Sequence, residues 1–326
     1  MQAFEYASPT TLKDALALLG SNWSDAAVLA GGTDLISMMK DYLTTPKRVV
    51  NIKGVKELGG ITKTAAGIRI GATVSVEELM SNAAVRAEYP SLAAAARGIT
   101  SPQIRNMGTV GGDLCQRPRC WYFRNGLGLL AMKDGRSLVA QGENQYHSIF
   151  GNGPAYFVSA SSFGPALIAL DAKVKLASAS GTREVEASKF FLAPASETQR
   201  EIALAPNEIL TEIVVPSARG ARNTTYEVRQ KDALDWPLVA ASVVLRMKGS
   251  TVDSARVVLG HVAPTPWVAA EAEKMLAGKS VSEEVAAQAG KAAVAGARPL
   301  SGNGYKVQLA SVAVKRALME AVNRKA

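Results

Sequence analysis

Two short segments that each contain a Gly-Gly pair constrain this chain more than any other feature. The first, Leu29 to Leu35, reads Leu-Ala-Gly-Gly-Thr-Asp-Leu, and the second, Gly108 to Leu114, reads Gly-Thr-Val-Gly-Gly-Asp-Leu. Glycine permits positive φ and a close approach of the backbone to a ligand, and successive N–H groups in such a turn form an anion-binding concavity. Either segment alone could be a tight turn. The pair predicts a site that holds the two phosphates of one dinucleotide.

Neither segment has the spacing of a common nucleotide-binding motif. A Rossmann site needs G-x-G-x-x-G and a P-loop needs G-x-x-x-x-G-K-[ST], and neither pattern is present in the two segments. The first segment runs into 35–40, which has helical spacing, so the positive end of a helix dipole would add to the attraction for an anion. The chain therefore predicts a dinucleotide site of another type.

Size and composition indicate a globular protein of about two domains. The chain has 326 residues, and a domain takes roughly 150. The net charge of +9 suits an acidic partner or a phosphate-bearing ligand. Two cysteines exclude a disulfide scaffold, and no apolar stretch reaches the roughly 20 residues that span a bilayer. The N-terminus lacks a signal-peptide pattern. A cytoplasmic protein without a membrane partner is expected, or a periplasmic one exported with a signal-bearing partner.

Strand and helix patterns differ before and after residues 217–223. The first part alternates short strands, at 4–7, 26–30 and 48–52, with helices, and it contains a glycine-punctuated loop over 98–114. The second part has three strand patterns, at 225–230, 239–247 and 254–262. Helices at 267–276 and 282–295 and a terminal helix follow, which predicts a small α+β domain.

The second glycine segment belongs to a longer and more specific string. Residues 103–112 read Gln-Ile-Arg-Asn-Met-Gly-Thr-Val-Gly-Gly. Together with Ala30–Leu35 and the strand Glu208–Pro216, this string closely resembles the FAD-binding subunit of the xanthine dehydrogenase family of molybdenum hydroxylases, and the resemblance covers nearly the whole chain. Within that family, Arg117–Arg124 is similar to the bacterial aldehyde oxidoreductase branch.

The resemblance implies both a fold and a role. The fold is α+β: a vanillyl-alcohol-oxidase-like (PCMH-type) FAD-binding domain over 1–217, with subdomains of about 1–55 and 56–217, and a C-terminal domain of CO dehydrogenase flavoprotein type over 222–326. The role is electron relay in a heterotrimer or a dimer of heterotrimers. A large subunit with the molybdenum cofactor would oxidise the substrate, which the resemblance to this branch implies is an aldehyde, and a small subunit would carry two [2Fe–2S] clusters. FAD in this chain would pass the electrons to an external acceptor.

The resemblance also implies which residues bind the cofactor. Ser162 stands where many relatives have an aspartate, and Lys231 matches a lysine near the flavin, although Arg229 could be its equivalent. A nearby cation would favour the anionic reduced flavin. No catalytic side chain and no metal ligand is expected. The implied cofactor-binding residues are Ala27, Val28, Leu29, Ala30, Gly31, Gly32, Thr33, Asp34, Leu35, Thr109, Gly111, Gly112, Asp113, Ser162, Leu210 and Lys231.

One departure from the aldehyde oxidoreductase branch concerns iron. Some of these relatives hold a [4Fe–4S] cluster in the insertion that follows the second glycine segment, and such a cluster takes four thiolates. Here the residues that follow the second glycine segment, 115–150, contain only Cys115 and Cys120, so no [4Fe–4S] cluster is expected in this chain. His147 has no ligand near it in the sequence, so a metal site is not expected there.

Two other functions are compatible with parts of the sequence. A free-standing FAD-dependent reductase would share the FAD domain, but it would need a catalytic acid and a substrate pocket, for which we find no constellation. A basic nucleic-acid-binding protein would fit the charge of +9. The basic residues are dispersed, however, and no aromatic-basic stripe is present, so no nucleic-acid partner is expected. The arginines near the second segment (Arg105, Arg117, Arg119 and Arg124) could be surface or contact residues, and Trp236 and Trp267 are expected to pack.

Overall fold

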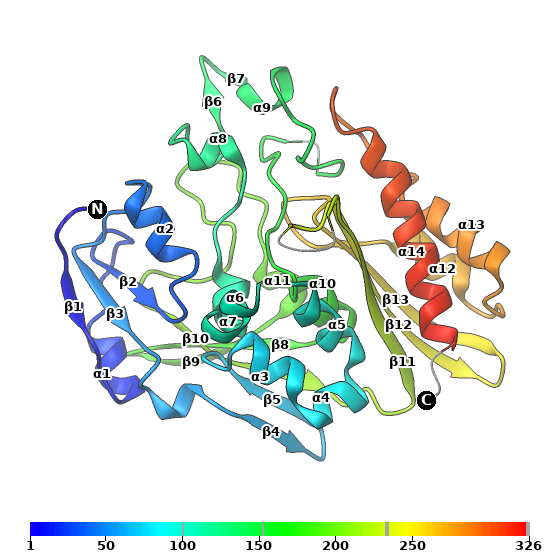
Figure 1. Ribbon diagram of the computed structural model, residues 1–326, viewed down its shortest axis with the longest axis horizontal. Coiled ribbons are helices and arrows are strands. Elements are labelled where there is room, and N and C mark those ends of the chain that lie inside the picture. The colour runs from blue at the N-terminus through cyan, green and yellow to red at the C-terminus, as the bar shows by residue number, and fades with distance from the viewer. Residues whose placement is uncertain (100, 152, 232–234, 324–326) are drawn as a thin grey trace.

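The computed structural model describes residues 1–99, 101–151, 153–231 and 235–323. Within these residues a three-stranded, a five-stranded and a four-stranded sheet follow one another along the chain, and Met132–Lys133 and Arg136–Ser137 form a small two-stranded sheet (Figure 1). In the first sheet all strands are parallel, in the order β1-β3-β2, and two helices follow β1 and β2. These elements are β1 Glu5–Ala7, α1 Leu12–Ala17, β2 Ala26–Leu29, α2 Leu35–Lys40 and β3 Arg48–Asn51, with a short 3-10 turn, η1, at Lys56–Leu58.

The second sheet is antiparallel and has the order β4-β5-β10-β8-β9. Its middle strand, β10, returns from far along the sequence and pairs with β5 and β8. Helices pack on one face of this sheet, and most of its apolar side chains meet there. The elements are β4 Ile61–Thr64, β5 Gly67–Gly71, α3 Val76–Ser81, α4 Ala83–Glu88, α5 Pro90–Gly98, α6 Pro102–Met107, α7 Val110–Cys115, α10 Gly164–Ala169, β8 Lys173–Ser178, β9 Gly181–Glu186, α11 Ala187–Phe190 and β10 Ile209–Pro216.

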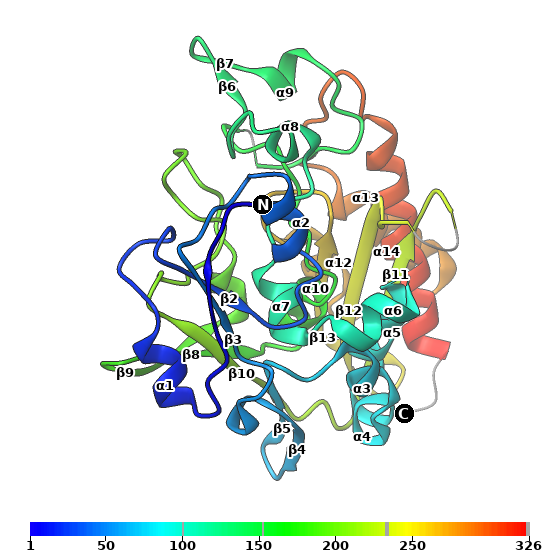
Figure 2. The same cartoon turned by 60° about the vertical axis from the view of Figure 1, so that its left-hand side comes forward.

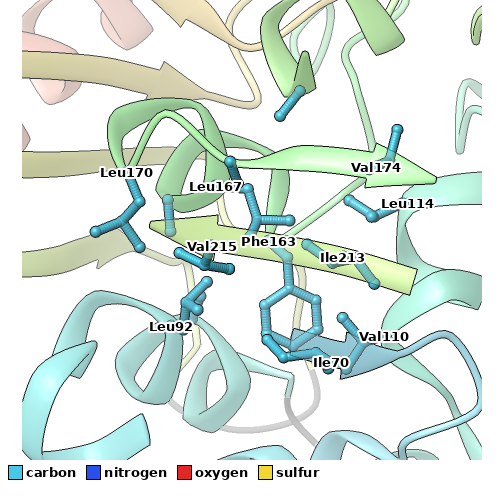
Figure 3. Close-up of a cluster of buried hydrophobic side chains, with 14 of the residues drawn as sticks. Ile70, Leu92, Val110, Leu114, Phe163, Leu167, Leu170, Val174, Ile213 and Val215 are labelled. Atoms are coloured by element: carbon cyan, nitrogen blue, oxygen red, sulfur yellow. The ribbon is translucent and has the colours of Figure 1, made fainter. Parts of the chain in front are cut away.

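The core of this second unit places the second glycine segment. Val110 and Leu114, on α7, lie beside Phe163, at the start of α10, and Ile213 of β10 (Figure 3). All four side chains are buried. Burial of each such side chain contributes about 1.5–3 kcal/mol, so this packing fixes α7, and the glycines within it, against the sheet.

The third sheet is antiparallel and has the order β11-β12-β13-β14. Helix α14 packs along β11 and β12 and against α13, on the right-hand side of Figure 1. Residues 267–268 form a short strand rather than the first turn of the expected helix, because Trp267 pairs with Leu259 and stacks on Phe150 at 4.5 Å between ring centroids. The elements are β11 Ala221–Val228, β12 Val239–Lys248, β13 Thr251–Gly260, β14 Trp267–Val268, α12 Ala270–Leu276, α13 Glu283–Ala293 and α14 Tyr305–Asn323.

Residues 116–160 leave the second unit and form a projecting segment, visible at the top of Figures 1 and 2. We call residues 116–160 the insertion. It contains little regular structure, and its base contacts the third unit through Lys306 and Asn303, as described below. Its elements are α8 Trp121–Arg124, β6 Met132–Lys133, β7 Arg136–Ser137 and α9 Leu138–Gln141.

The structure corrects the expectation that 98–114 is a loop. This stretch contains α6 and α7, each six residues long. The side chains of Ser101 and Thr109 cap these two helices by accepting hydrogen bonds from the backbone N–H groups of Ile104 and Gly112. Pro102 stands at the first position of α6, where proline costs no hydrogen bond. None of the helices in the described residues is long and apolar enough to cross a membrane.

Candidate cofactor-binding site

A cleft with a volume of about 690 Å³ lies where the first sheet, the second sheet and the turn at 235–237 come together. This volume is in the range of small-molecule and cofactor sites. Both glycine segments line the cleft, as do Ser162 and Leu210. Of the residues predicted to bind the cofactor, all except Leu29 and Lys231 are among the lining residues.

The two glycine segments lie against each other. A Cβ atom on Gly31 would lie 2.1 Å from the carbonyl oxygen of Met107 and 2.8 Å from Cα of Gly108. Gly32 has a backbone φ of +74°, a value that residues other than glycine rarely adopt. The first segment therefore needs glycine at both positions, at Gly31 for contact with the second segment and at Gly32 for the turn into α2.

The second segment is the N-terminus of α7. Thr109 caps the helix, with its Oγ1 accepting from the N–H of Gly112 at 3.0 Å. The N–H of Gly111 donates to the carbonyl oxygen of Ala72 at 3.0 Å, and a Cβ on Gly111 would lie 2.8 Å from Cβ of Ala72. Gly111 is thus required by packing on the end of β5, independently of any ligand.

Asp113 connects α7 to the start of α10. Its carboxylate accepts from Ser161 Oγ at 2.5 Å and from the N–H of Phe163 at 3.2 Å. The N–H of Ser162 donates to it at 3.3 Å. Burial raises the pKa of Asp113 to about 6, against the lowering effect of these hydrogen bonds. Asp113 therefore fixes the wall of the cleft, and Ser162 is held at the cleft through its backbone.

Asp34, in the first glycine segment, holds the insertion. Its carboxylate accepts from Arg124 Nη2 at 2.8 Å and from the N–H of Arg117 at 2.9 Å. Arg119 Nη2 lies 3.5 Å from the same carboxylate. One residue of the predicted site thus ties the base of the insertion to the cleft.

The two predicted flavin-proximal cations lie outside the lining of the cleft. Lys231 is exposed, and its N–H donates to Asp235 at 3.2 Å. Arg229 pairs with the buried carboxylate of Glu227 behind Gly98. The role of either cation toward the flavin stays a prediction. The arginines that line the cleft are Arg117, Arg119 and Arg200.

Several lining residues were not predicted as cofactor-binding residues. Trp236, expected to pack, is 44% exposed at the cleft and lies under the guanidinium of Arg119, 4.6 Å from the ring centroid. Trp23 and Arg200 form a similar pair at 4.0 Å. Because 23, 119, 200 and 236 are far apart in the sequence and belong to no shared motif, only the tertiary structure brings them together.

Comparison with known proteins decides the family. A family model described as "FAD binding domain in molybdopterin dehydrogenase" matches residues 2–218, and one described as "CO dehydrogenase flavoprotein C-terminal domain" matches residues 224–321. The chain belongs to this family. It is thus a FAD-binding medium subunit of molybdenum hydroxylase type, and the FAD expected from the sequence is confirmed as its cofactor.

Two relatives in this flavoprotein family match over nearly their whole length. The carbon monoxide dehydrogenase medium chain of Hydrogenophaga pseudoflava is 34% identical over 97% of this chain and 96% of its own. The aldehyde oxidoreductase FAD-binding subunit PaoB of Escherichia coli is 30% identical over 98% of this chain and 99% of its own. A solved structure of the Hydrogenophaga pseudoflava enzyme, which lacks the Mo-pyranopterin moiety, superposes with a TM-score of 0.76 over 100% of this chain and 99% of that one, at 33% identity.

The residues of the cleft fit the FAD of the family. The Gly112 and Gly32 regions offer the close backbone approach that a pyrophosphate needs. Arg200 Nε is buried and has no hydrogen-bond partner within the described part of the chain, so the cleft presents an unused donor. A cradle in which arginine side chains accompany the glycine backbone is the chemistry that a dinucleotide requires.

The two cysteines lie in different surroundings. Cys115 lines the cleft, and burial raises the pKa of its thiol to about 12. Cys120 Sγ lies 3.1 Å from His147 Nε2, a neighbour in space that the spacing along the sequence does not reveal. Across the residues that the structure describes, no group of three or more His, Cys, Asp or Glu side chains could hold a metal ion. The absence of a [4Fe–4S] cluster stays a prediction.

Proposed function

We propose that this flavoprotein is the electron-relay subunit of a three-subunit molybdenum hydroxylase. The electrons would come from the [2Fe–2S] clusters of a small subunit and go to an external acceptor. A large subunit with the molybdenum cofactor would oxidise the substrate. The observation that supports the proposal most strongly is that both glycine segments converge on one cleft in a chain that matches known medium chains from end to end.

The side chains of the cleft position the cofactor. FAD, when bound, supplies the redox chemistry. The glycine segments would let the phosphates approach the backbone closely, while α7 is held rigidly by Asp113 and by the core around Phe163. Trp23 and Trp236 place aromatic surface on the cleft, which limits the access of water. The residues of the cleft thus bind and orient the cofactor, and neither role requires a general base.

We propose an aldehyde as the substrate of the complex. The support is the similarity of Arg117–Arg124 to the aldehyde oxidoreductase branch, together with PaoB, whose name gives that activity. Carbon monoxide dehydrogenase medium chains are also among the relatives of comparable identity. We propose the cytoplasm as the location, with co-export to the periplasm as the alternative. We also propose that the chain divides into a FAD-binding domain over 1–217 and a C-terminal domain over 222–326.

Purification of the tagged chain from its own host tests the proposal. We expect a large and a small chain to co-purify, with molybdenum and iron in the complex, and we expect the chain expressed alone to contain FAD but no iron. The competing function, a free-standing reductase, predicts that the chain alone consumes NADH or NADPH with a substrate at ordinary enzymatic rates. That result, without any co-purifying chain, would contradict the relay.

A further inference from the structure

Two arginines in the cleft are only loosely neutralised. Arg119 Nη2 lies 3.5 Å from Asp34 Oδ1, but the same oxygen accepts from Arg124 Nη2 at 2.8 Å. Arg119 also donates to Gln116 Oε1 at 3.2 Å, and its guanidinium lies on the ring of Trp236. Arg124 is therefore the closer partner of the Asp34 carboxylate, and the charge of Arg119 is only weakly compensated.

Arg200 repeats this arrangement with different partners. It lies 3.7 Å from Glu201 Oε2, whereas Arg117 is in direct contact with Glu201 Oε1. Its guanidinium lies on the ring of Trp23, and its Nε is buried without a hydrogen-bond partner among the described residues. In both places two arginines share one carboxylate, and the more distant arginine stacks on a tryptophan and lines the cleft.

The other carboxylates of the cleft are already engaged. Asp113 accepts from Ser161 and Phe163, and Glu208 accepts from both Nε and Nη2 of Arg183. Asp235 accepts from the N–H groups of Lys231 and Trp236. Each group of two arginines and one carboxylate carries one more positive than negative charge, and Arg119 and Arg200 are the more distant arginines of the two groups.

Burial makes this surplus charge unfavourable in the absence of a ligand. It lowers the pKa of Arg119, and it lowers the pKa of Arg200 to about 10, where the nearby Arg117 acts in the same direction. Arg119 and Arg200 keep 34% and 20% of their side-chain surface exposed, and a partly buried charge without a close partner costs free energy that an arriving anion recovers. The geometry is that of a site prepared for negative charge.

We propose that Arg119 and Arg200 are the side chains that meet the negative charge of bound FAD. The proposal rests on FAD as the cofactor and extends it to two residues that belong to neither glycine segment. Guanidinium groups form paired hydrogen bonds with phosphate oxygens and with planar acceptors. Stacking on Trp236 and Trp23 holds each guanidinium plane while its N–H edge stays free. The negative charge could be that of the pyrophosphate or that which the ring gains on reduction.

Variants of the full chain test the proposal. Arg119→Gln and Arg200→Gln are each expected to weaken FAD binding to the flavin-free protein by about 10-fold, or to lower the midpoint potential of bound FAD. Arg119→Lys should recover part of the loss, because the charge remains while the paired geometry is lost. Arg136→Gln, which removes an exposed arginine of the insertion, is the matched control and should bind FAD as the unaltered chain does.

A second ligand distinguishes the two sources of negative charge. If the arginines meet the pyrophosphate, ADP binding should weaken by the same factor as FAD binding. If they meet the ring, ADP binding should stay unchanged while the potential falls. Unchanged FAD affinity and unchanged potential in both glutamine variants would overturn the proposal, and FAD bound to the unaltered chain would still support the proposed function.

A measurement on the unaltered protein covers the case in which a variant does not fold. Phenylglyoxal modifies accessible arginines, and peptide mass mapping locates the modified residues. FAD should protect Arg119 and Arg200 and leave Arg136 equally reactive. Equal modification of Arg119 and Arg200 with and without FAD would overturn the proposal.

Discussion

At the scale of single residues, the shape of the cleft depends on glycines, which have no side chain, as well as on the side chains that line it. Gly31 allows the two glycine segments to touch, and Gly111 allows α7 to pack on Ala72. The sequence motif alone indicates only that glycine is needed. The structure shows a different reason at each position. Gly31 and Gly111 are required because a Cβ atom would collide with neighbouring segments, whereas Gly32 is required because its φ is positive.

Gly31→Ala is expected to separate the two segments. The new Cβ would lie 2.1 Å from the carbonyl oxygen of Met107, a distance that requires backbone movement. We expect a loss of about 1–3 kcal/mol in unfolding free energy and a clear fall in flavin content. Absorbance of the purified protein and its denaturant unfolding curve measure both. Gly304→Ala, where a Cβ meets nothing within 4 Å, is the control. An alanine variant with full flavin content would disprove this role of Gly31.

Asp113 should make stability depend on pH in a defined window. Its pKa is about 6 in the folded chain, above the ordinary value of 3.8, so the folded state disfavours the ionised form. The stability that Asp113 contributes is therefore present below about pH 4 and is lost as the pH rises through 6, by about 3 kcal/mol. The unfolding free energy of Asp113→Asn should lack this loss. Parallel pH curves for the two proteins would contradict the assignment.

At the scale of elements, the insertion is fixed to the cleft at its base and projects at its tip. Asp34 accepts from the side chain of Arg124 and the backbone of Arg117. The segment over 117–119 thereby becomes a wall of the cleft, and this includes Arg119. An element with little regular structure can thus help to form a binding site when one partly buried carboxylate orders it.

Asp34→Ala is expected to release this wall. It leaves Arg124 and the N–H of Arg117 without their acceptor, at a cost of about 3 kcal/mol. Hydrogen exchange over 117–124 should become faster, and FAD should bind more weakly. Asp41→Ala, at an exposed position next to α2, is the control. Unchanged exchange over 117–124 in Asp34→Ala would show that other contacts hold the segment.

The sequence predicts elements with strong local signals and misses those made by distant contacts. The strands at 26–30 and 239–247 follow from apolar runs, and β2 and β12 occupy nearly those residues. The short helices α6 and α7 were missed, because glycine-rich sequence usually indicates a loop and their stability comes from caps and packing. The glycine segments of the site follow from a motif, whereas the Arg–Trp pairs have no local signal.

At the scale of the whole molecule, polar contacts join the insertion to the C-terminal unit. Lys306, at the start of α14, is fully buried, and its Nζ donates to the carbonyl oxygens of Tyr146, His147 and His261 at 3.3, 3.1 and 2.7 Å. Asn303 Nδ2 donates to two carbonyl oxygens of the same segment. These bonds order the residues that follow α9 and connect them to the end of β13.

Lys306→Met should loosen this junction. The methionine keeps much of the apolar length of the side chain but removes the donor to the carbonyl oxygens of Tyr146, His147 and His261, of which that of His147 keeps Asn303 as a donor, at a cost of about 3 kcal/mol. We expect a lower melting temperature and faster hydrogen exchange over 144–150, with FAD content largely retained. Lys291→Met, at an exposed position on α13, is the control. Equal melting temperatures for Lys306→Met and Lys291→Met would contradict this account of the junction.

The most direct measurement of the central claim follows the visible absorbance of the flavin in this chain under anaerobic conditions. We expect that an aldehyde bleaches the flavin when this chain is assembled with its large and small partners, and that it does not bleach the flavin of the isolated chain. Bleaching in the isolated chain by aldehyde alone, or an assembled complex in which aldehyde turnover leaves the flavin oxidised, would contradict the claim that this subunit relays electrons from its partners.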